Sequence, residues 1–446
     1  MDEIINFFFR IAIKLLQLLN SKILTYFFFR LFITIEKNKY EYDYTILILD
    51  IERFRGDIEL FAKAEKIRVL KISWTFLAYL LRCFVNLSLL NKTKNLHGKR
   101  GEFLSSKKGT KTYEQRGDYR NFLRIYLPFI LKKLNVQLVI NSELRYKREA
   151  DILKVLTEIK VPYICFYREA LFIAKAQYKS AVMRHKEYGN FCGDFIAVQN
   201  EITKKMFVES GIVNPNKIIV RGCPRMDNYI QEIKKNKKII KRKNKVISFF
   251  TSPIEIHHSE RNKPGIKLFK YTSKILIEVI KFIDKHENFR LIIKVKDSHM
   301  KSQIQKIEKL IFDHSTNSGA KRISINSEKM SAQQVIFNSD LIFAAQSTVV
   351  IEAAITRKPV IISLPYDILS NKYLKDMIMF YPELNLFSSP IKINKIQSII
   401  MNKIDDFKPN ISYHKKINNM FSKYVSNLNM NSTKYCTDLI KGIIDG

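Results

Sequence analysis

The sequence lacks several features that would assign it to a familiar class at once. It contains no stretch of 18 uncharged apolar residues, so a membrane-spanning helix is not expected. Glycine and proline are scarce, at 13 and 11 of 446 residues, which favours regular secondary structure along most of the chain. The five cysteines are scattered and form no C-x-x-C pair, which argues against a zinc site or a disulfide framework.

Common cofactor motifs are also missing. There is no G-x-x-x-x-G-K-[ST] phosphate loop, no G-x-G-x-x-G turn and no D-x-D motif. These absences weigh against kinases, P-loop enzymes and dinucleotide-dependent enzymes. We expect neither a bound metal nor a cofactor.

Acidic residues are in short supply: 42 Asp and Glu stand against 77 Lys and Arg, a formal net charge of +35. Such an excess favours an anionic partner, which is nucleic acid, anionic lipid or a phosphate-bearing substrate. A general compositional bias toward Lys, Ile and Asn explains the charge equally well. We expect no specific binding of nucleic acid.

Residues 4–35 are rich in Phe, Ile and Leu, interrupted by Arg10, Lys14, Lys22 and Arg30. A helix of this composition suits a membrane interface, where basic side chains meet anionic headgroups. Packing of the same helix on the protein's own body is an equal alternative. A small-residue cleavage site is missing, so we expect a cytoplasmic protein, with a peripheral position on the inner face of the cytoplasmic membrane left open.

From about residue 41, short apolar runs rich in β-formers alternate with helical patterns. Continuous apolar strands between helices are typical of a parallel sheet covered on both faces. The alternation breaks at a Lys-rich stretch and then restarts, which predicts two similar α/β domains. We predict five parts. A basic, hydrophobic helical segment covers residues 1–40, and a first Rossmann-like domain covers residues 41–229. A basic linker at 230–245 leads to a second Rossmann-like domain at 246–390 and to a helical tail at 391–446.

Ligands of open parallel sheets bind beyond the carboxyl ends of the strands, so polar residues that follow strands are the candidates for a site. The clearest example follows the strand at 340–344, where Ser347 and Thr348 open a predicted helix that runs to Lys358. Ser347 can cap this helix, whose N-terminal N–H groups suit a diphosphate. Glu352 lies one turn after Thr348 and can accept hydrogen bonds from ribose hydroxyls. An ordinary capped helix with a solvated Glu352 is the alternative.

Other strand ends carry weaker signals of the same kind. Arg225 and Asp227 follow Gly222 and Pro224 in a tight turn, where the guanidinium can meet phosphate and Asp227 can hold it or cap a helix. Further candidates for phosphate contact leave two strands of the second half: Thr251, Ser252, Lys294 and Lys296. Each of these also has a plain structural interpretation as a turn or a surface ion pair.

Activation of an acceptor needs a base, and Glu169 follows the strand at 163–166. We predict that Glu169 faces the cleft between the two domains as the catalytic base. Helix capping by this carboxylate is the alternative.

Two stretches carry a resemblance to a known group: 200–227, which contains G-C-P-R-M-D, and 339–367, which contains Q-S-T-V-V-I-E. Together they resemble bacterial surface-carbohydrate and teichoic-acid-type transferases over about residues 135–370. The resemblance implies an α/β GT-B-like fold, two Rossmann-like parallel-sheet domains with an interdomain cleft. It also implies that Ser347, Thr348 and Glu352 hold a nucleotide-diphosphate donor. CDP-glycerol transferases usually carry Lys-x-His-Pro and an early His-Gly after a strand, and this chain departs from both patterns.

These departures favour sugar transfer. The leading hypothesis is a glycosyltransferase that moves a sugar from a nucleotide-diphosphate donor to a lipid-linked or glycan acceptor, as in capsule, lipopolysaccharide or teichoic acid synthesis. The alternatives are a transferase of polyol phosphate from CDP-glycerol, a UDP-sugar epimerase of the same fold, and a non-enzymatic basic protein that binds membranes or nucleic acid.

Overall fold

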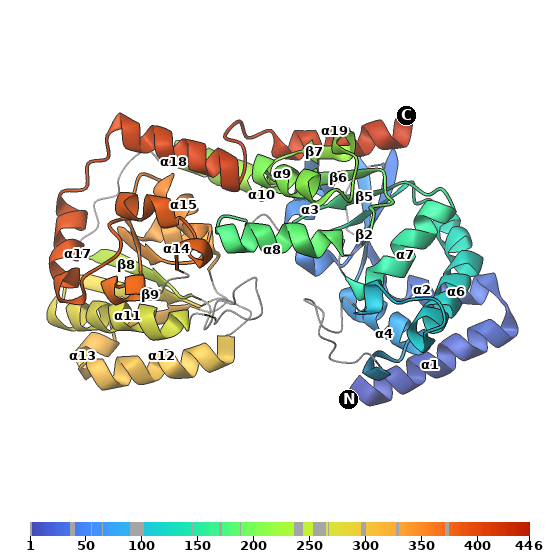
Figure 1. Cartoon of the computed structure of the whole chain (residues 1–446), viewed down its shortest axis with the longest axis horizontal. Helices are drawn as coiled ribbons and strands as arrows, with labels where there is room; N and C mark the ends of the chain where they lie inside the picture. Colours follow the sequence, from blue (N-terminus) through green and yellow to red (C-terminus); the bar gives the residue numbers. More distant parts are fainter. Residues whose placement is uncertain are drawn as a thin grey trace. The chain divides into compact units, whose positions relative to one another are not determined.

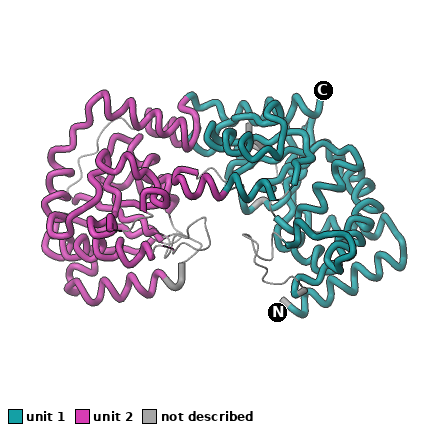
Figure 2. Tube along the Cα trace, viewed as in Figure 1, with its two compact units in different colours: residues 1–170, 181–228, 429–446 teal, residues 171–180, 229–428 magenta. Residues whose placement is uncertain are grey.

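The structure is a computed structural model of the whole chain. It describes residues 2–35, 41–54, 56–64, 66–89, 102–144, 146–168, 172–187, 189–235, 244–252, 265, 267–295, 300–326, 330–370 and 374–446. Two compact units make up the chain (Figure 2). Unit 1 comprises residues 1–170, 181–228 and 429–446, and unit 2 comprises residues 171–180 and 229–428.

Unit 1 is built on a seven-stranded sheet with the order β1-β3-β2-β4-β5-β6-β7. Figure 1 labels β2, β5, β6 and β7 of this sheet. All neighbouring pairs are parallel except β1 and β3, which are antiparallel. The strands are β1 Ile33–Ile35, β2 Tyr44–Leu49, β3 Ile67–Ile72, β4 Leu138–Asn141, β5 Tyr163–Phe166, β6 Phe195–Val198 and β7 Ile218–Val220. The described part of the predicted helical segment 1–40, residues 2–35, therefore ends in an edge strand of this sheet.

Helices cover both faces of the unit 1 sheet, as its continuous apolar strands require. The helices that pack in unit 1 are α1 Asp2–Leu19, α2 Lys22–Arg30, α3 Asp57–Ala64, α4 Trp74–Phe84, α6 Lys111–Lys133, α7 Lys147–Glu158, α9 Glu201–Ser210 and α19 Ser432–Asp445. Successive residues of β2 point to opposite faces. Leu47 and Leu49 join a core cluster with α4, α6 and α7, whereas Ile46 and Ile48 join a second cluster with residues of α3 and α19.

Two helices run from one unit into the other: α8 Lys175–Lys186 and α10 Pro224–Lys235. The division falls after Asn228, inside α10. Residues 230–235, predicted as part of a linker, are therefore helical, and residues 236–243 lie outside the described part of the chain. A helix forms here because Tyr229 and Ile230 are buried while the Lys residues of α10 stay at its surface.

Unit 2 contains a five-stranded sheet, parallel throughout, with the order β10-β9-β8-β11-β12. Its strands are β8 Lys245–Phe250, β9 Phe289–Lys294, β10 Ile323–Asn326, β11 Leu341–Ala344 and β12 Val360–Ile362. Its helices are α11 Leu268–Lys285, α12 Met300–His314, α13 Asn317–Ala320, α14 Ala332–Asn338, α15 Val349–Ala354, α16 Leu374–Met377, α17 Ile396–Asp405 and α18 Ile411–Tyr424. Two α/β domains with parallel sheets, as predicted, are confirmed.

The predicted helical tail 391–446 is divided between the units. Helices α17 and α18 pack in unit 2, where α17 contacts α11 and α18 contacts α15. Helix α19 packs in unit 1 against α3 and β4. The reason lies in its buried side chains, since Cys436 and Ile440 complete the cluster on one face of the unit 1 sheet.

The described residues also contain short 3-10 turns. They are η1 Ile51–Arg53, η2 Leu87–Leu89, η3 Pro215–Lys217, η5 Tyr366–Ser370, η6 Tyr381–Phe387 and η7 Ile393–Lys395. No helix in the described ranges is both long and apolar enough to cross a membrane.

Candidate functional site

The strand order of each sheet singles out one position for a ligand. In unit 2 the chain starts at β8, runs outward through β9 and β10, and then returns to the other side of β8 as β11. Connections diverge at such a switch point, and ligands of open parallel sheets bind there, at the carboxyl edge of the sheet between the loops after β8 and β11. The segments that follow these two strands are Thr251–Ser252 and Ser347–Thr348. Four hydroxyl-bearing residues thus flank the switch point of unit 2.

A buried glutamine fixes the segment after β8. The Thr251 hydroxyl donates to Gln303 Oε1 at 3.0 Å, and Gln303 Nε2 donates to the Ser252 carbonyl at 2.9 Å. The Thr251 N–H donates to the carbonyl of Lys294, which ends β9, at 3.0 Å. Among the described residues, the buried Ser252 hydroxyl has no hydrogen-bond partner. A ligand that enters here would meet a hydroxyl group with hydrogen-bonding capacity to spare.

The segment after β11 is held by Gln346, which adopts a left-handed backbone conformation with φ of 50°. Its side chain donates to the Met377 carbonyl at 2.9 Å and accepts from the Met379 N–H at 2.6 Å. Non-glycine residues occupy this region only when their surroundings hold them there, and such positions cluster at functional sites. Gln346 therefore fixes the path of the chain directly before Ser347.

Helix α15 is shorter than predicted. It covers Val349–Ala354 instead of running from Ser347 to Lys358. Arg357 turns into the left-handed region, with φ of 63°, and Pro359 disfavours helical geometry in the residue before it. The Ser347 hydroxyl accepts from the Val349 N–H at 3.3 Å, and the Ser347 carbonyl accepts from the Val350 N–H at 3.4 Å. Two of the first N–H groups of this helix thus have partners already.

The Glu352 carboxylate lies almost buried, with 6% exposure, between two donors. Thr348 donates to Oε1 at 2.6 Å, and Gln333 of α14 donates to Oε2 at 2.8 Å. A carboxylate offers about four lone-pair positions, so these bonds leave acceptor capacity for a diol. Thr348 and Glu352, which the sequence predicts to lie on one helix face, are in contact. Gln333 belongs to the same hydrogen-bonded group, and sequence reasoning did not include it.

The remaining predicted residues are placed as follows. In unit 1, Arg225 donates to Asp57 Oδ2 at 2.8 Å, and Asp227 accepts from the N–H and the hydroxyl of Thr433 at 2.8 and 3.0 Å. These contacts tie α10 to α3 and α19. Lys296 and the predicted base Glu169 lie outside the described residues.

The switch point of unit 1 carries carboxylates in place of hydroxyls. Here the parallel strands start with β2, which has β3 on one side and β4 on the other. Asp50 follows β2 directly, and Ser142 and Glu143 follow β4. Asp50 is fully buried and holds a left-handed backbone conformation with φ of 58°. Sequence reasoning did not include Asp50 and Glu143, although Asp50 ends the apolar run T-I-L-I-L-D at 45–50, the first of the alternating β-forming runs.

A buried network surrounds Asp50. Arg148 of α7 forms an ion pair with the Asp50 carboxylate, and its guanidinium lies 4.7 Å from the centre of the Tyr146 ring. Glu149 Oε2 accepts from Asn141 Nδ2 at 3.2 Å. Burial raises the pKa of the fully buried Glu149 carboxyl well above its usual value, and the Asp50 charge adds to this rise. Buried carboxyl groups of this kind are candidates for proton transfer. Within the described ranges, no group of three His, Cys, Asp or Glu side chains is placed to hold a metal ion.

We expect Glu149→Gln to stabilise unit 1 at neutral pH. The unfolded chain releases the Glu149 proton at the usual pKa of 4.5, whereas the raised pKa in the folded protein holds the proton to higher pH. The free energy of unfolding therefore falls as pH rises from 4.5 toward the pKa of the folded state. The variant should match the parent below about pH 4.5 and exceed it above, by about 1.4 kcal/mol for each pKa unit of the shift. Urea unfolding followed by the fluorescence of Trp74, the one tryptophan, measures this. An identical pH dependence in both proteins would refute the neutral form of Glu149.

Comparison with known proteins gives similarity in structure alone. No family model matches the sequence, and no curated protein matches it either. The chain resembles the UDP-GlcNAc 2-epimerase of Neisseria meningitidis, at 12% identity and a TM-score of 0.46, over 89% of this chain and 99% of that one.

Two transferases from the solved structures are similar to the same degree. The wall teichoic acid polymerase TagF is 14% identical with a TM-score of 0.48, over 99% of this chain and 98% of that one. A glycosyltransferase of Rickettsia africae is 14% identical with a TM-score of 0.43, over 91% and 100% of the two chains. Since these scores lie below 0.5, the site geometry has to carry the functional argument by itself.

Proposed function

We propose that this chain is a GT-B-like transferase that takes a group from a nucleotide-diphosphate donor bound at the switch point of unit 2. The observation that carries the proposal is the convergence of Thr251, Ser252, Ser347 and Thr348 on the carboxyl edge between β8 and β11, with the Glu352 carboxylate held beside them. The Ser252 hydroxyl has no partner among the described residues and the Ser347 hydroxyl acts as an acceptor, so both can donate to phosphate oxygens without a metal. The Thr251 and Thr348 hydroxyls already donate, to Gln303 and Glu352, and hold those two side chains in place. A carboxylate with free lone pairs binds a ribose diol. This pairing matches the two halves of a nucleotide diphosphate.

The contacts of α15 change which groups we expect to bind the phosphates of the donor. Because Ser347 already occupies two N–H groups at the start of this six-residue helix, the hydroxyl groups carry more of the phosphate binding than a helix N-terminus does. Lys294 ends the neighbouring strand β9, and its ammonium can neutralise a leaving diphosphate. Lys296 stays a prediction for the same role, and Arg225 and Asp227 stay predictions for substrate binding.

The reaction also needs a base that activates the acceptor hydroxyl. Glu169 follows β5 of unit 1 and keeps this predicted role. Asp50 and Glu143 follow β2 and β4 of the same sheet, at its switch point, and are added to Glu169 as candidates. Their support is positional, because ligands of parallel sheets lie at this edge.

The transferred group that we favour is a sugar, with a lipid-linked or glycan acceptor of a bacterial surface polysaccharide. We also propose that the protein works at the inner face of the cytoplasmic membrane. These finer assignments are supported by the departures from the CDP-glycerol transferase motifs and by the excess of positive charge, +35 overall.

The donor site is tested with Glu352→Gln. We expect its affinity for the preferred nucleotide diphosphate to fall about tenfold or more, because a hydrogen bond from a ribose hydroxyl to a charged acceptor contributes roughly 1.5–3 kcal/mol. Isothermal titration calorimetry with UDP, CDP, GDP and dTDP measures the loss. UDP-sugars and CDP-glycerol, titrated next, distinguish sugar transfer from polyol-phosphate transfer.

The matched control is Glu308→Gln, which removes an exposed carboxylate from α12 of the same unit and should leave affinity unchanged. Circular dichroism of all three proteins checks that each is folded. The donor site is wrong if the parent protein binds a nucleotide and Glu352→Gln binds it equally well.

A further inference from the structure

Large exposed hydrophobic side chains concentrate on the first two helices. Of the 21 exposed residues of this kind in the described part of the chain, 11 lie within the first 31 positions. They are Ile4, Phe7, Phe8, Ile11, Leu15, Leu18, Leu19, Ile23, Leu24, Phe27 and Leu31. Single exposed apolar residues are ordinary on a protein surface, but a contiguous set marks an interaction site.

Helix α1 is apolar on two opposite sides. At about 100° per residue, Phe9, Ile13 and Leu16 share one side, and these three are buried. The opposite side, here called the outer face, follows the spacing i, i+4, i+7, i+11 and i+14. Its members are Ile4, Phe8, Ile11, Leu15 and Leu18, all at least 40% exposed. A surface helix of a soluble protein normally carries polar residues in that position.

The inner side shows that α1 belongs to the folded body of unit 1. The Phe9 ring lies 5.2 Å from the Tyr79 ring of α4 and 5.6 Å from the Phe28 ring of α2, measured between centroids. Helix α1 contacts α4, and α2 contacts α6. Figure 1 shows α1 running along the outside of unit 1 beside α4. The outer face is therefore presented by a fixed helix.

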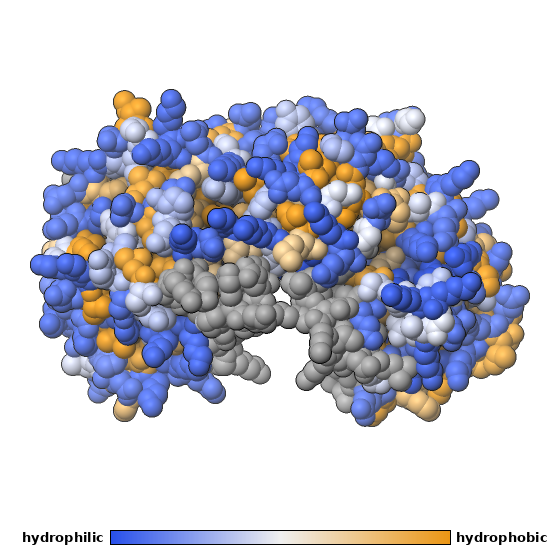
Figure 3. Space-filling model, in the orientation of Figure 1, coloured by the Kyte–Doolittle hydropathy of each residue, from blue (hydrophilic) through white to orange (hydrophobic). Residues whose placement is uncertain are grey.

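Positive charge flanks the outer face. Arg10, Lys14 and Lys22 are exposed, and residues 4–35 contain no Asp or Glu. On the helical wheel, Arg10 and Lys14 lie between the outer face and the buried side of α1. On this side of unit 1, the space-filling view shows hydrophobic surface among hydrophilic side chains (Figure 3). An apolar strip with basic residues along its border matches lipid tails bordered by anionic headgroups.

We infer that α1 docks on an anionic lipid bilayer through its outer face and lies in the plane of the interface. The inward side keeps α1 attached to unit 1 while Phe8, Leu15 and Leu18 enter the boundary between headgroups and acyl chains. A second copy of the chain is a poorer occupant, because pairing two such faces would bring Arg10, Lys14 and Lys22 of both copies together, with Asp2 and Glu3 as the only acidic residues of the first 35 positions. The inference names the membrane-contacting surface of the proposed transferase and rests on contacts in unit 1 alone.

The structure also decides how the surface is tested. Deletion of residues 1–36 would remove Phe9, Ile13, Leu16, Phe29 and Ile33 from the core, so loss of binding could reflect unfolding. Substitutions on the outer face avoid this problem. The test variant is Phe8→Gln/Leu15→Gln/Leu18→Gln in the full chain. The control is Phe312→Gln/Ile411→Gln, which removes two apolar side chains that are each 87% exposed on unit 2.

Flotation with vesicles of phosphatidylcholine and phosphatidylglycerol (7:3) measures binding. We expect the triple variant to bind the vesicles at least about tenfold more weakly than the parent protein. The unit 2 control should bind like the parent. Lys14→Gln/Lys22→Gln should weaken binding several-fold, and added salt should do the same to the parent. Vesicles of phosphatidylcholine alone should bind all of these proteins poorly.

Equal flotation of the folded triple variant and the parent would overturn the inference. A second set of results would also overturn it: the parent protein is dimeric by light scattering and does not float with vesicles, and the triple variant is monomeric. The outer face would then be an interface between two copies of the chain. Nucleotide titration of the same variants separates the two proposals. A triple variant that loses flotation and still binds the nucleotide supports the docking surface, whatever the fate of the donor site.

Discussion

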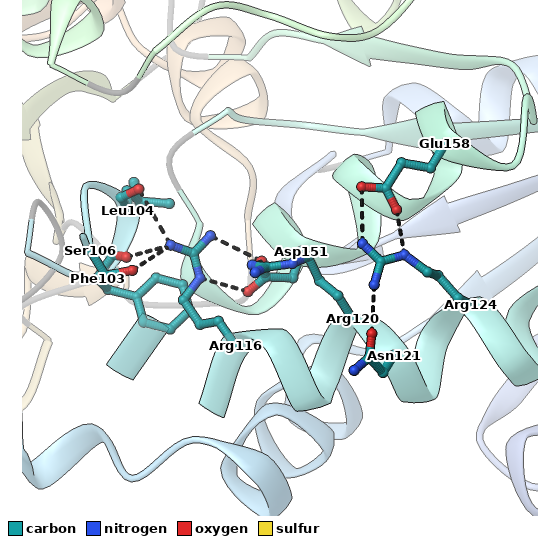
Figure 4. Close-up of polar contacts among 9 residues, drawn as sticks. All are labelled: Phe103, Leu104, Ser106, Arg116, Arg120, Asn121, Arg124, Asp151 and Glu158. Atoms are coloured by element: carbon teal, nitrogen blue, oxygen red, sulfur yellow. Dashed lines mark hydrogen bonds and ion pairs between the residues drawn. The ribbon is translucent and has the colours of Figure 1, made fainter. Parts of the chain in front are cut away.

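Replacement of Asp151 by Ala is expected to destabilise unit 1 by about 3–5 kcal/mol, because it would leave two buried guanidinium groups without their counter-charge. Arg116 donates to Asp151 through Nε and Nη2 at 2.9 and 3.0 Å, and Arg120 donates through Nη1 at 2.8 Å (Figure 4). Both arginines are less than 9% exposed. Arg116 also donates to the Phe103 carbonyl at 2.6 Å, so the network joins α6, α7 and the segment before α6.

The matched control is a second ion pair between the same two helices, one turn after Arg120 in α6 and two turns after Asp151 in α7. Arg124 of α6 donates to both carboxylate oxygens of Glu158 of α7, at 2.7 and 3.2 Å, but this pair is exposed (Figure 4). Glu158→Ala should therefore cost only about 0–1 kcal/mol.

Urea unfolding followed by Trp74 fluorescence reports on unit 1 by itself, since the only tryptophan lies in α4. If Asp151→Ala and Glu158→Ala lower the free energy of unfolding by the same amount, burial of an ion pair does not determine how much it stabilises unit 1.

The contrast between these two ion pairs shows where sequence reasoning stops. Alternating apolar runs and helical patterns predict both α/β domains, because burial on two sheet faces leaves a direct trace in the sequence. Asp151 lies 31 and 35 positions from its two arginines. A pattern within a helix or strand contains no information about a partner at that distance.

The candidate site shows the same boundary. The rule that ligands lie beyond strand ends leads to Thr251, Ser252, Ser347 and Thr348 from sequence alone. The order of the strands is a tertiary property, and it is this order that distinguishes the two switch points from the other strand ends. Asp50 ends a strand that the pattern predicts, but its importance appears only when β2 is seen between β3 and β4.

The C-terminal helix is the clearest case of an element whose existence is predictable and whose location is not. A polar helical pattern at 432–445 gives no sign that the helix packs on the first unit of the chain. The structure supplies the reason in its buried contacts. Arg221, only 1% exposed, donates to Cys436 Sγ at 3.4 Å, and its guanidinium lies 4.6 Å from the centre of the Phe166 ring. Asp227 accepts from the N–H of Thr433 and so anchors the first turn.

Removal of residues 429–446 is therefore expected to abolish cooperative folding of unit 1, although the truncated chain retains all seven strands of its sheet. The deletion would uncover the cluster formed by Ile46, Ile48 and Ile140 and would leave Arg221 without Cys436. Ile440→Ala tests the same contact more gently and should cost about 2–5 kcal/mol, because it empties a fully buried position. Tyr435→Ala, at a position 52% exposed on the same helix, should change stability by about 0.5 kcal/mol or less. Trp74 fluorescence during urea unfolding measures all three variants. A truncated chain that unfolds at the same urea concentration as the parent would show that α19 is dispensable for unit 1.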